Sequence, residues 1–304
     1  FVDSIPLISF TGGPQTYMLG RGVLQELERQ QDNVFPHVIQ PMVKRNWDVQ
    51  HVDLLADVLP RAFNTMLSGR PGPVHIELPM DVQAEVTDVP MPVPAERRAT
   101  SGAVRPDPDA IDKAAAKLLG AKRPVILAGG GCLEAQASAE LRKVAEYLDA
   151  AVVVTMMGKG VFPEDHPLDA EHTGSNGTLV GNHMTKNADV ILAVGTRFAE
   201  QTSSSFLDGM SFSIPPTEIV HLDIDPTEIG KNYPTAVGAV CDAKAGLADL
   251  YDALVDHNGS EGLSRPEYRN EIAELRQKWQ EMLTGRWTGK LSLSQVLHKA
   301  REVL

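Results

Sequence analysis

The sequence contains very little cysteine and no long apolar run. Only Cys132 and Cys241 occur among 304 residues, and neither belongs to a CxxC pair. This excludes a disulfide framework and a four-cysteine zinc site, so we expect both thiols to be buried core residues. No apolar run approaches the roughly 18 residues that a membrane-spanning helix needs, and no signal-peptide pattern begins the chain. We therefore expect a soluble, cytoplasmic protein without membrane contact.

Basic residues are also in deficit. The chain carries 28 Lys and Arg against 40 Asp and Glu, which gives a formal net charge of -12. No Lys/Arg-rich run creates a local exception, so non-specific binding to nucleic acid or to an anionic membrane is disfavoured. With 42% hydrophobic and 22% charged residues, the composition is ordinary for a globular protein, and the length allows roughly two domains.

Apolar strand-like runs alternate with helical patterns in two blocks of the chain. Residues 84–106 between the blocks are rich in proline and are predicted to form an extended linker. The predicted strands are 6–10, 37–43 and 72–78 before the linker, and 123–131, 150–156, 188–198 and 217–225 after it. Because the later strands are uniformly apolar, we predict an α/β fold with doubly wound parallel sheets.

Glycines and charged residues follow the predicted strands of the second block. Gly129, Gly130 and Gly131 end one strand, and Gly195 with Arg197 ends another. In a doubly wound sheet the ligand crevice lies outside the carboxyl ends of the strands. Glycines there suit the close approach of a diphosphate, and an arginine suits its charge. The pattern favours a nucleotide cofactor, although a glycine after a strand is more often only a turn.

Two carboxylates, Asp223 and Asp225, end the strand at 217–225. An acid at such a position can accept hydrogen bonds from ribose hydroxyl groups. An Asp before Pro-Thr-Glu can instead cap the next helix. We predict ribose contact for Asp223 and capping for Asp225.

Four motifs, in this order and at these distances, resemble a known family. They are RPGPVHIELPMDVQ (70–83), KRPVILAGGG (122–131), HLDIDPTEIGKNYP (221–234) and VCDAKAGL (240–247). The chain is similar to the thiamine diphosphate (ThDP) enzymes related to acetolactate synthase, which are flavoproteins of branched-chain amino acid biosynthesis.

The resemblance implies a domain assignment over almost the whole chain. Residues 1–83 would be the C-terminal part of the pyrimidine-binding domain, 84–106 the linker, and 107–257 the central FAD-binding or nucleotide-binding domain. Residues 258–304 would be a connector and the first helix of the diphosphate-binding domain. The catalytic glutamate of the family and its GDG motif, which holds Mg²⁺ and the ThDP diphosphate, would lie outside these residues. The resemblance thus implies no metal ligands in this chain, and no activity for the chain by itself.

The resemblance also implies a cofactor site and partners. In the family, the central domain holds FAD, and Gln25 matches a glutamine near the reaction centre. The implied FAD-contacting residues are Arg70, Gly129, Gly130, Gly131, Thr155, Met156, Met157, Gly177, Gly195, Arg197, Asp223 and Asp242. The implied substrate is a small 2-keto acid such as pyruvate, and the implied assembly is a homodimer or homotetramer.

Several positions depart from the synthase pattern. Met80 stands where the synthases have a lysine, and Gln201 where they have an arginine that would hold the carboxylate of a second 2-keto acid. A neutral glutamine does not offer that charged fork. Leu24, Gly13-Pro14-Gln15 and Asn176 also differ from the residues usual in the family. These departures argue against a second 2-keto acid as the acceptor. They bear less on the carbanion chemistry, which belongs to the ThDP cofactor.

Three interpretations follow. The first is an acetolactate synthase-like carboligase or lyase with ThDP, Mg²⁺ and FAD. The second is a sibling ThDP decarboxylase or hydrolase whose central domain binds ADP or nothing. The third is a non-catalytic nucleotide-binding module, such as one related to the NAD-dependent deacylases, and the absence of a zinc cysteine quartet argues against that version.

Overall fold

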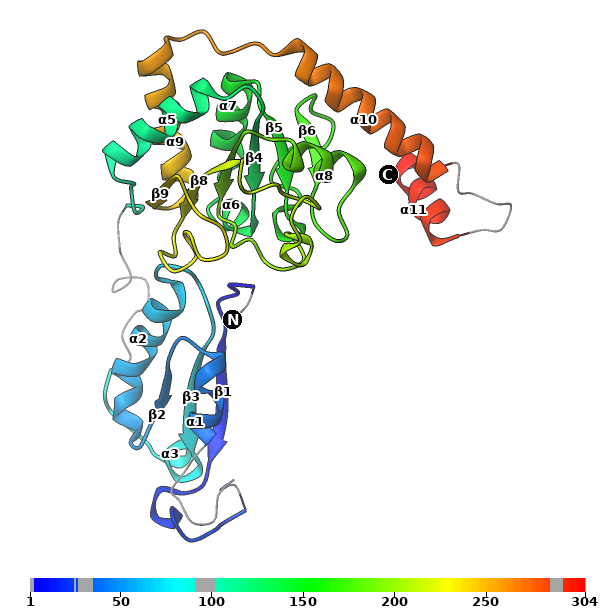
Figure 1. Ribbon diagram of the computed structural model, residues 1–304. Coiled ribbons are helices and arrows are strands. Elements are labelled where there is room, and N and C mark those ends of the chain that lie inside the picture. The colour runs from blue at the N-terminus through cyan, green and yellow to red at the C-terminus, as the bar shows by residue number, and fades with distance from the viewer. Residues whose placement is uncertain (1–2, 25, 27–34, 91–101, 285–291, 304) are drawn as a thin grey trace. The chain divides into compact units, whose positions relative to one another are not determined.

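The computed structural model describes residues 3–24, 26, 35–90, 102–284 and 292–303 (Figure 1). Two compact units are present, residues 1–102 and residues 103–304. The division falls inside the stretch 84–106 that the sequence predicts as a linker. The family-based identity of each domain stays a prediction.

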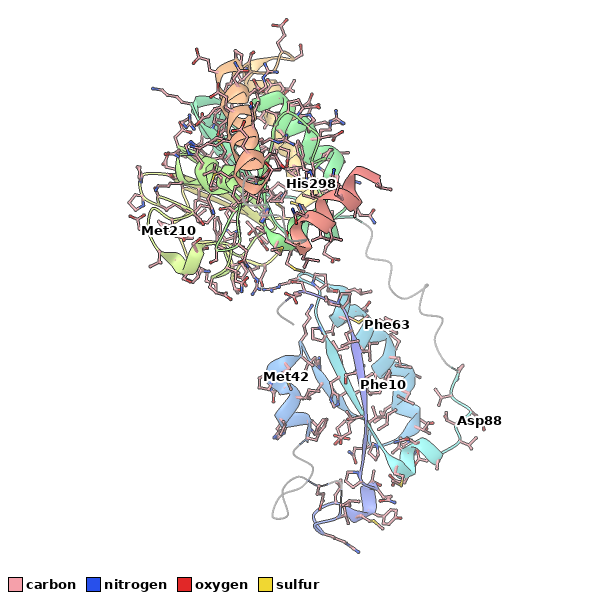
Figure 2. All side chains as sticks on the ribbon, turned by 90° about the vertical axis from the view of Figure 1, so that its right-hand side faces the viewer. Phe10, Met42, Phe63, Asp88, Met210 and His298 are labelled. Carbon is pink, nitrogen blue, oxygen red and sulfur yellow. The ribbon has the colours of Figure 1, made fainter. Side chains whose placement is uncertain are left out.

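The first unit is a small parallel sheet covered by helices. Its order is β1-β3-β2, and all pairs are parallel. Its elements are β1 (Ile8–Gly13), α1 (Phe35–Ile39), β2 (Asn46–Asp48), α2 (Leu55–Leu67), β3 (Val74–Pro79) and α3 (Met80–Ala84). The core lies between the sheet and α2, where Val74 and Ile76 are completely buried. Phe63 of α2 packs against this core, whereas Phe10 and Met42 each expose more than half of their surface (Figure 2).

The prediction of a strand at 37–43 is wrong. The segment forms the end of α1 and a 3₁₀ turn at Gln40–Met42. Two prolines explain the difference. Pro36 lies in the first turn of α1, where its fixed φ suits a helix, and Pro41 has no N–H to donate to a strand ladder.

The second unit is a six-stranded parallel sheet in the order β6-β5-β4-β7-β8-β9. The strands are β4 (Pro124–Ala128), β5 (Ala151–Val154), β6 (Asp169–His172), β7 (Val190–Val194), β8 (Glu218–Asp223) and β9 (Val237–Val240). The helices are α5 (Pro108–Gly120), α6 (Gly130–Glu134), α7 (Ser138–Leu148), α8 (Leu179–Lys186), α9 (Ala243–Asn258), α10 (Pro266–Thr284) and α11 (Leu293–Val303). Parallel strands with helices confirm the predicted α/β fold.

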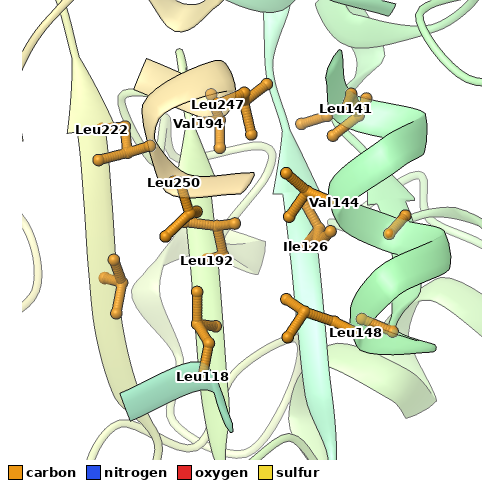
Figure 3. Close-up of a cluster of buried hydrophobic side chains, with 14 of the residues drawn as sticks. Leu118, Ile126, Leu141, Val144, Leu148, Leu192, Val194, Leu222, Leu247 and Leu250 are labelled. Atoms are coloured by element: carbon orange, nitrogen blue, oxygen red, sulfur yellow. The ribbon is translucent and has the colours of Figure 1, made fainter. Parts of the chain in front are cut away.

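Helices cover both faces of this sheet, as uniformly apolar strands require. Ile126 of β4 faces a cluster shared with α5, α7 and α9, and Leu127 faces a second cluster shared with α8 and α10. Figure 3 shows the first cluster, in which leucines of three helices pack on the strands. Its labelled residues are Leu118, Ile126, Leu141, Val144, Leu148, Leu192, Val194, Leu222, Leu247 and Leu250.

Helix α10, which lies in the segment predicted to be a connector, is held to the second sheet by specific contacts. The buried Tyr268 hydroxyl donates to the carbonyl of Pro124 at 3.1 Å. Arg123 donates to both carboxylate oxygens of Glu271 at 2.9 Å, and His183 lies 2.9 Å from one of them. Among the described residues, no helix combines the length and apolarity needed to cross a membrane.

Asp169, at the amino end of β6, is a buried carboxyl group whose burial raises its pKa to about 6. The folded state therefore binds a proton more tightly than the unfolded state, so this group makes folding less favourable above about pH 6 and ceases to do so below about pH 4. We expect Asp169→Asn to increase the free energy of unfolding at pH 7 by about 1 to 3 kcal/mol.

Urea denaturation of the 304-residue chain at pH 7 and pH 4 measures this effect. The gain should largely vanish at pH 4, where the parent carboxyl is protonated in the folded state. Asp165→Asn, at an exposed position four residues earlier, is the matched control and should change little. Equal gains at both pH values would contradict the electrostatic explanation.

Candidate functional site

The order of the second sheet reverses between β4 and β7, and this creates a topological switch point. Chain order runs outward from β4 through β5 to β6 on one side, and from β7 through β8 to β9 on the other. The loops that follow β4, β5, β7 and β8 therefore emerge at one edge of the sheet. The crevice at this edge is where open α/β sheets bind ligands.

The glycines after β4 and β7 pack against each other. A Cβ atom added at Gly129 would lie 2.1 Å from the carbonyl oxygen of Gly195 and 2.7 Å from the Cβ atom of Thr196. Gly195 has a φ of +56°, and a Cβ there would lie 2.7 Å from the Cα atom of Gly131. The two loops can thus approach closely only without side chains, a reason for glycine that the sequence analysis did not identify.

Arg197 projects from the turn after β7 and is half-buried. Its guanidinium group has no hydrogen-bonding or ionic partner among the residues that the structure describes. The next residue, Phe198, has a φ of 48° and is buried. Its ring lies 5.4 to 5.6 Å from those of Phe212, His221 and Tyr233. The turn is thus anchored by an aromatic cluster while the neighbouring cation stays available for an anionic ligand.

Asp223 and Asp225 make different contacts in the structure, as the sequence predicts, but Asp225 does not have the predicted capping role. Asp223 is buried, and its Oδ1 accepts from the backbone N–H of Asp225 at 2.9 Å. Asp225 accepts from the N–H and the hydroxyl of Thr227 at 3.0 and 2.6 Å. The prediction that Asp225 caps a helix is wrong, because residues 226–230 form a turn. Proline and glycine at 226 and 230 fit that shorter structure.

Asp242, the second acid of the predicted adenosine end, caps α9. Its side chain accepts from the N–H of Ala245 at 3.0 Å, as an N-cap aspartate does. Asp242 therefore has a structural role as the N-cap of α9. Its predicted contact with FAD stays a prediction.

The loop after β5 combines a buried hydroxyl with exposed apolar groups. Thr155 caps the 3₁₀ turn Met156–Gly158 by accepting from Gly158 N–H at 3.1 Å. Met156 is 56% exposed and Met157 is 54% exposed. Gly130 lies against Met157, since an added Cβ would be 3.2 Å from its Cβ atom. The two thioethers offer an apolar surface beside the glycine loop.

The loop after β6 is joined to the loop after β7. The N–H of Gly177 donates to the carbonyl of Gly174 at 2.8 Å and closes a tight turn. Ser175 N–H donates to the carbonyl of Gln201 at 2.8 Å, so the backbone of Gln201 is fixed while its side chain is exposed. A half-buried network around Asn182, which accepts from the Thr173 hydroxyl and from Gly174 N–H, supports this junction.

The other residues considered in the sequence analysis lie in the first unit or outside the residues that the structure describes. Gln25 lies outside the described residues. Arg70 donates from Nε to the hydroxyl of Ser4 at 2.8 Å. Met80 begins α3, is 48% exposed, and its sulfur lies 3.3 Å from the amide nitrogen of Gln15. Among the described residues, no group of three His, Cys, Asp or Glu side chains is placed to hold a metal ion.

Both cysteines are buried, as predicted. Burial raises the pKa of the Cys132 and Cys241 thiols to about 12. Both remain protonated at neutral pH and are unsuited to nucleophilic chemistry.

Two polar residues that contact the Arg197 turn were missed by the sequence analysis. His221 lies within β8, and its Nε2 is 2.8 Å from the carbonyl oxygen of Thr196. Asn232 donates from Nδ2 to the carbonyls of Arg197 and Phe198 at 3.2 and 3.0 Å. The available signal for His221 was a polar residue inside an otherwise apolar strand.

Comparison with known proteins finds a family match within the second unit. Residues 111–250 match the model of the thiamine pyrophosphate enzyme central domain. The matched range runs from the first turn of α5 to the middle of α9, and it includes all six strands of the second sheet.

Three curated relatives resemble more of the chain. It is 37% identical over 258 residues to the probable acetolactate synthase large subunit of Methanocaldococcus jannaschii, which covers 84% of this chain and 42% of the relative. It is 34% identical over 252 residues to the acetolactate synthase large subunit of Corynebacterium glutamicum, covering 83% and 38%. It is 30% identical over 303 residues to the acetolactate synthase isozyme 3 large subunit of Escherichia coli, covering 99% and 49%. The chain therefore spans less than half the length of each of these relatives.

Proposed function

Because the chain belongs to the thiamine diphosphate-dependent enzymes related to acetolactate synthase, we propose that it forms part of a 2-keto acid carboligase or lyase. In this proposal the second unit binds FAD at the switch point of its sheet. The observation that carries this proposal is the half-buried Arg197. Its guanidinium group has no hydrogen-bonding or ionic partner among the described residues, and it lies where open α/β sheets bind nucleotides.

The residues at the switch point fit a dinucleotide. Arg197 would donate charge-assisted hydrogen bonds to the diphosphate. Asp223, which lies at the end of β8, would accept from the ribose hydroxyl groups. Met156 and Met157 would cover an apolar part of the ligand. Together these groups offer a cation, a carboxylate and an apolar surface at one edge of one sheet.

The proposed reaction depends on a second cofactor. ThDP supplies, when bound, stabilisation of the negative charge that decarboxylation leaves on a 2-keto acid. We propose that Mg²⁺ and the ThDP diphosphate are held by residues beyond this chain. The proposed substrate is a small 2-keto acid such as pyruvate, and the proposed assembly is a homodimer or homotetramer.

A sibling ThDP enzyme with ADP in the central domain is the second candidate. The observation that favours it is the neutral character of Met80 and Gln201, where the resemblance implies a lysine and an arginine. The absorption spectrum of the purified full-length protein separates the two candidates, since bound flavin absorbs visible light. A colourless protein that binds ADP would contradict the FAD proposal and support the sibling.

Asp223→Asn tests the ribose contact. The substitution keeps one oxygen that can accept from Asp225 N–H, but its amide nitrogen does not accept from a hydroxyl. We expect the affinity for FAD or ADP to fall by about 1 to 3 kcal/mol, which isothermal titration calorimetry on the full-length protein can measure. Asp208→Asn, at an exposed carboxylate of the same unit, is the control and should bind like the parent. Unchanged affinity in Asp223→Asn would leave Asp223 with a structural role alone.

A further inference from the structure

Four consecutive carbonyl groups in the turn after β7 all accept hydrogen bonds from other elements. The first accepts from the backbone N–H of Gly131 at 3.1 Å, and the second from His221 Nε2 at 2.8 Å. The third and fourth accept from Nδ2 of Asn232 at 3.2 and 3.0 Å. The accepting carbonyls belong to Gly195, Thr196, Arg197 and Phe198.

The side chains that make these bonds can act only as donors here. A backbone carbonyl only accepts, so Nε2 of His221 carries the hydrogen and the tautomer is fixed. Burial lowers the pKa of His221, which keeps the ring neutral near pH 7. The two carbonyls beside Asn232 likewise fix which end of its amide is the NH₂ group.

The turn needs such support because its backbone is strained. Phe198 has a φ of 48°, in the left-handed region that is unfavourable for a residue with a Cβ atom, whereas Gly195, with a φ of 56°, adopts this region without a steric penalty. Arg197 lies between them. An arginine on an unsupported turn of this kind would sample many positions, and a ligand would have to order it on binding.

We propose that His221 and Asn232 are positioning residues that fix the backbone on both sides of Arg197, so that its guanidinium is pre-organised for a diphosphate. This inference rests on the proposed nucleotide site and adds the two residues that prepare it. They bracket the stretch HLDIDPTEIGKN at residues 221–232, whose ends reach back to one turn although they are 25 and 35 residues away from it in sequence. The effect of Asn232 reaches the ligand through Arg197, so it is confined to ligands that carry a diphosphate. His221 Nε2 also lies 3.9 Å from Oδ2 of Asp223, so this residue can act on the ribose contact as well.

The experiment compares ADP with adenosine in the full-length protein. Asn232→Ala and His221→Leu should each weaken ADP binding by about three- to thirtyfold in calorimetry, which corresponds to the loss of one or two hydrogen bonds. Asn232→Ala should leave adenosine binding unchanged, and His221→Leu should weaken it less than it weakens ADP binding, because His221 also lies beside Asp223. His221→Gln should restore most of the ADP affinity, because the glutamine amide can donate from a position close to that of Nε2.

A matched control is available in the same unit. Asn187 also donates from its amide to a backbone carbonyl, that of His183 at 2.8 Å, but it lies at the end of α8. Asn187→Ala removes an equivalent bond and should leave the affinities for both ligands unchanged. Thermal unfolding of every variant shows whether a loss of binding follows from a loss of fold.

A double-mutant cycle tests whether the effect passes through Arg197. Arg197→Gln should weaken ADP binding by itself, and adding Asn232→Ala should then cost little more. Additive losses, or equal losses for ADP and adenosine, would overturn the positioning role while leaving the proposed nucleotide site intact. If the parent protein bound neither ADP nor FAD, the proposed site and this inference would both be wrong.

Discussion

Replacing Gly129 by alanine is expected to destabilise the second unit by at least about 3 kcal/mol and to abolish nucleotide binding. The added Cβ would lie 2.1 Å from the carbonyl oxygen of Gly195. Neither loop can move away easily. Gly129 N–H donates to the carbonyl of Val194 at 2.9 Å, and Gly131 N–H donates to that of Gly195 at 3.1 Å. Urea denaturation of the 304-residue chain measures the loss.

The matched control for this variant is Gly120→Ala. Gly120 ends α5, and a Cβ added there would meet nothing within 4 Å. We expect this substitution to be neutral or stabilising by up to about 1 kcal/mol. If Gly129→Ala were as stable as Gly120→Ala, the close contact between the two glycine loops would not be a feature of the folded protein.

The sequence was most informative where strands are apolar on both faces. β4, β7 and β8 have such sequences, and all three were predicted. β6 was missed because its residues, Asp169 to His172, include two acids and a histidine. An edge strand such as β6 can accommodate these polar residues. β9 was missed because it is four residues long and contains Gly238.

The carboxyl-end rule predicted, without any contact information, that the loops after β4 and β7 meet, and the structure confirms this contact. Parallel strands all end at one edge, so the glycines after β4 and Gly195 after β7 lie near each other. The structure gives these glycines a reason beyond the predicted approach of a diphosphate, which stays a prediction. They allow two backbone loops to touch, and that reason depends on the distance between loops that lie about 65 residues apart in sequence.

Contacts of His221 and Asn232 were beyond sequence reasoning for a physical reason. A histidine in a buried strand and an asparagine after a turn are each common, and neither pattern specifies a partner. Their partner carbonyls belong to one turn, which becomes their neighbour only when β7 and β8 pair in register. Local propensity contains no information on that register.

In the full-length protein, Met80→Lys combined with Gln201→Arg is expected to increase the formation of acetolactate from pyruvate by about tenfold to a hundredfold. The resemblance implies that these positions carry cations for the carboxylate of the second keto acid. Each restored charge would contribute on the order of 1 to 2 kcal/mol in the transition state. Both native side chains are exposed, so the larger cations need not disturb a packed core. Steady-state kinetics with pyruvate measures the change.

Two controls make this expectation specific. Gln83→Lys adds a cation to an exposed position of α3, three residues after Met80, and should not increase acetolactate formation. A pH series tests whether the new lysine is charged, because a desolvated ammonium group would lose its proton and hide the gain at neutral pH. At a position that leaves Met80 48% exposed, we expect that desolvation to be small. If the parent enzyme already forms acetolactate at roughly 1 to 1,000 turnovers per second, the two cations are not required and the substrate argument from Met80 and Gln201 is wrong.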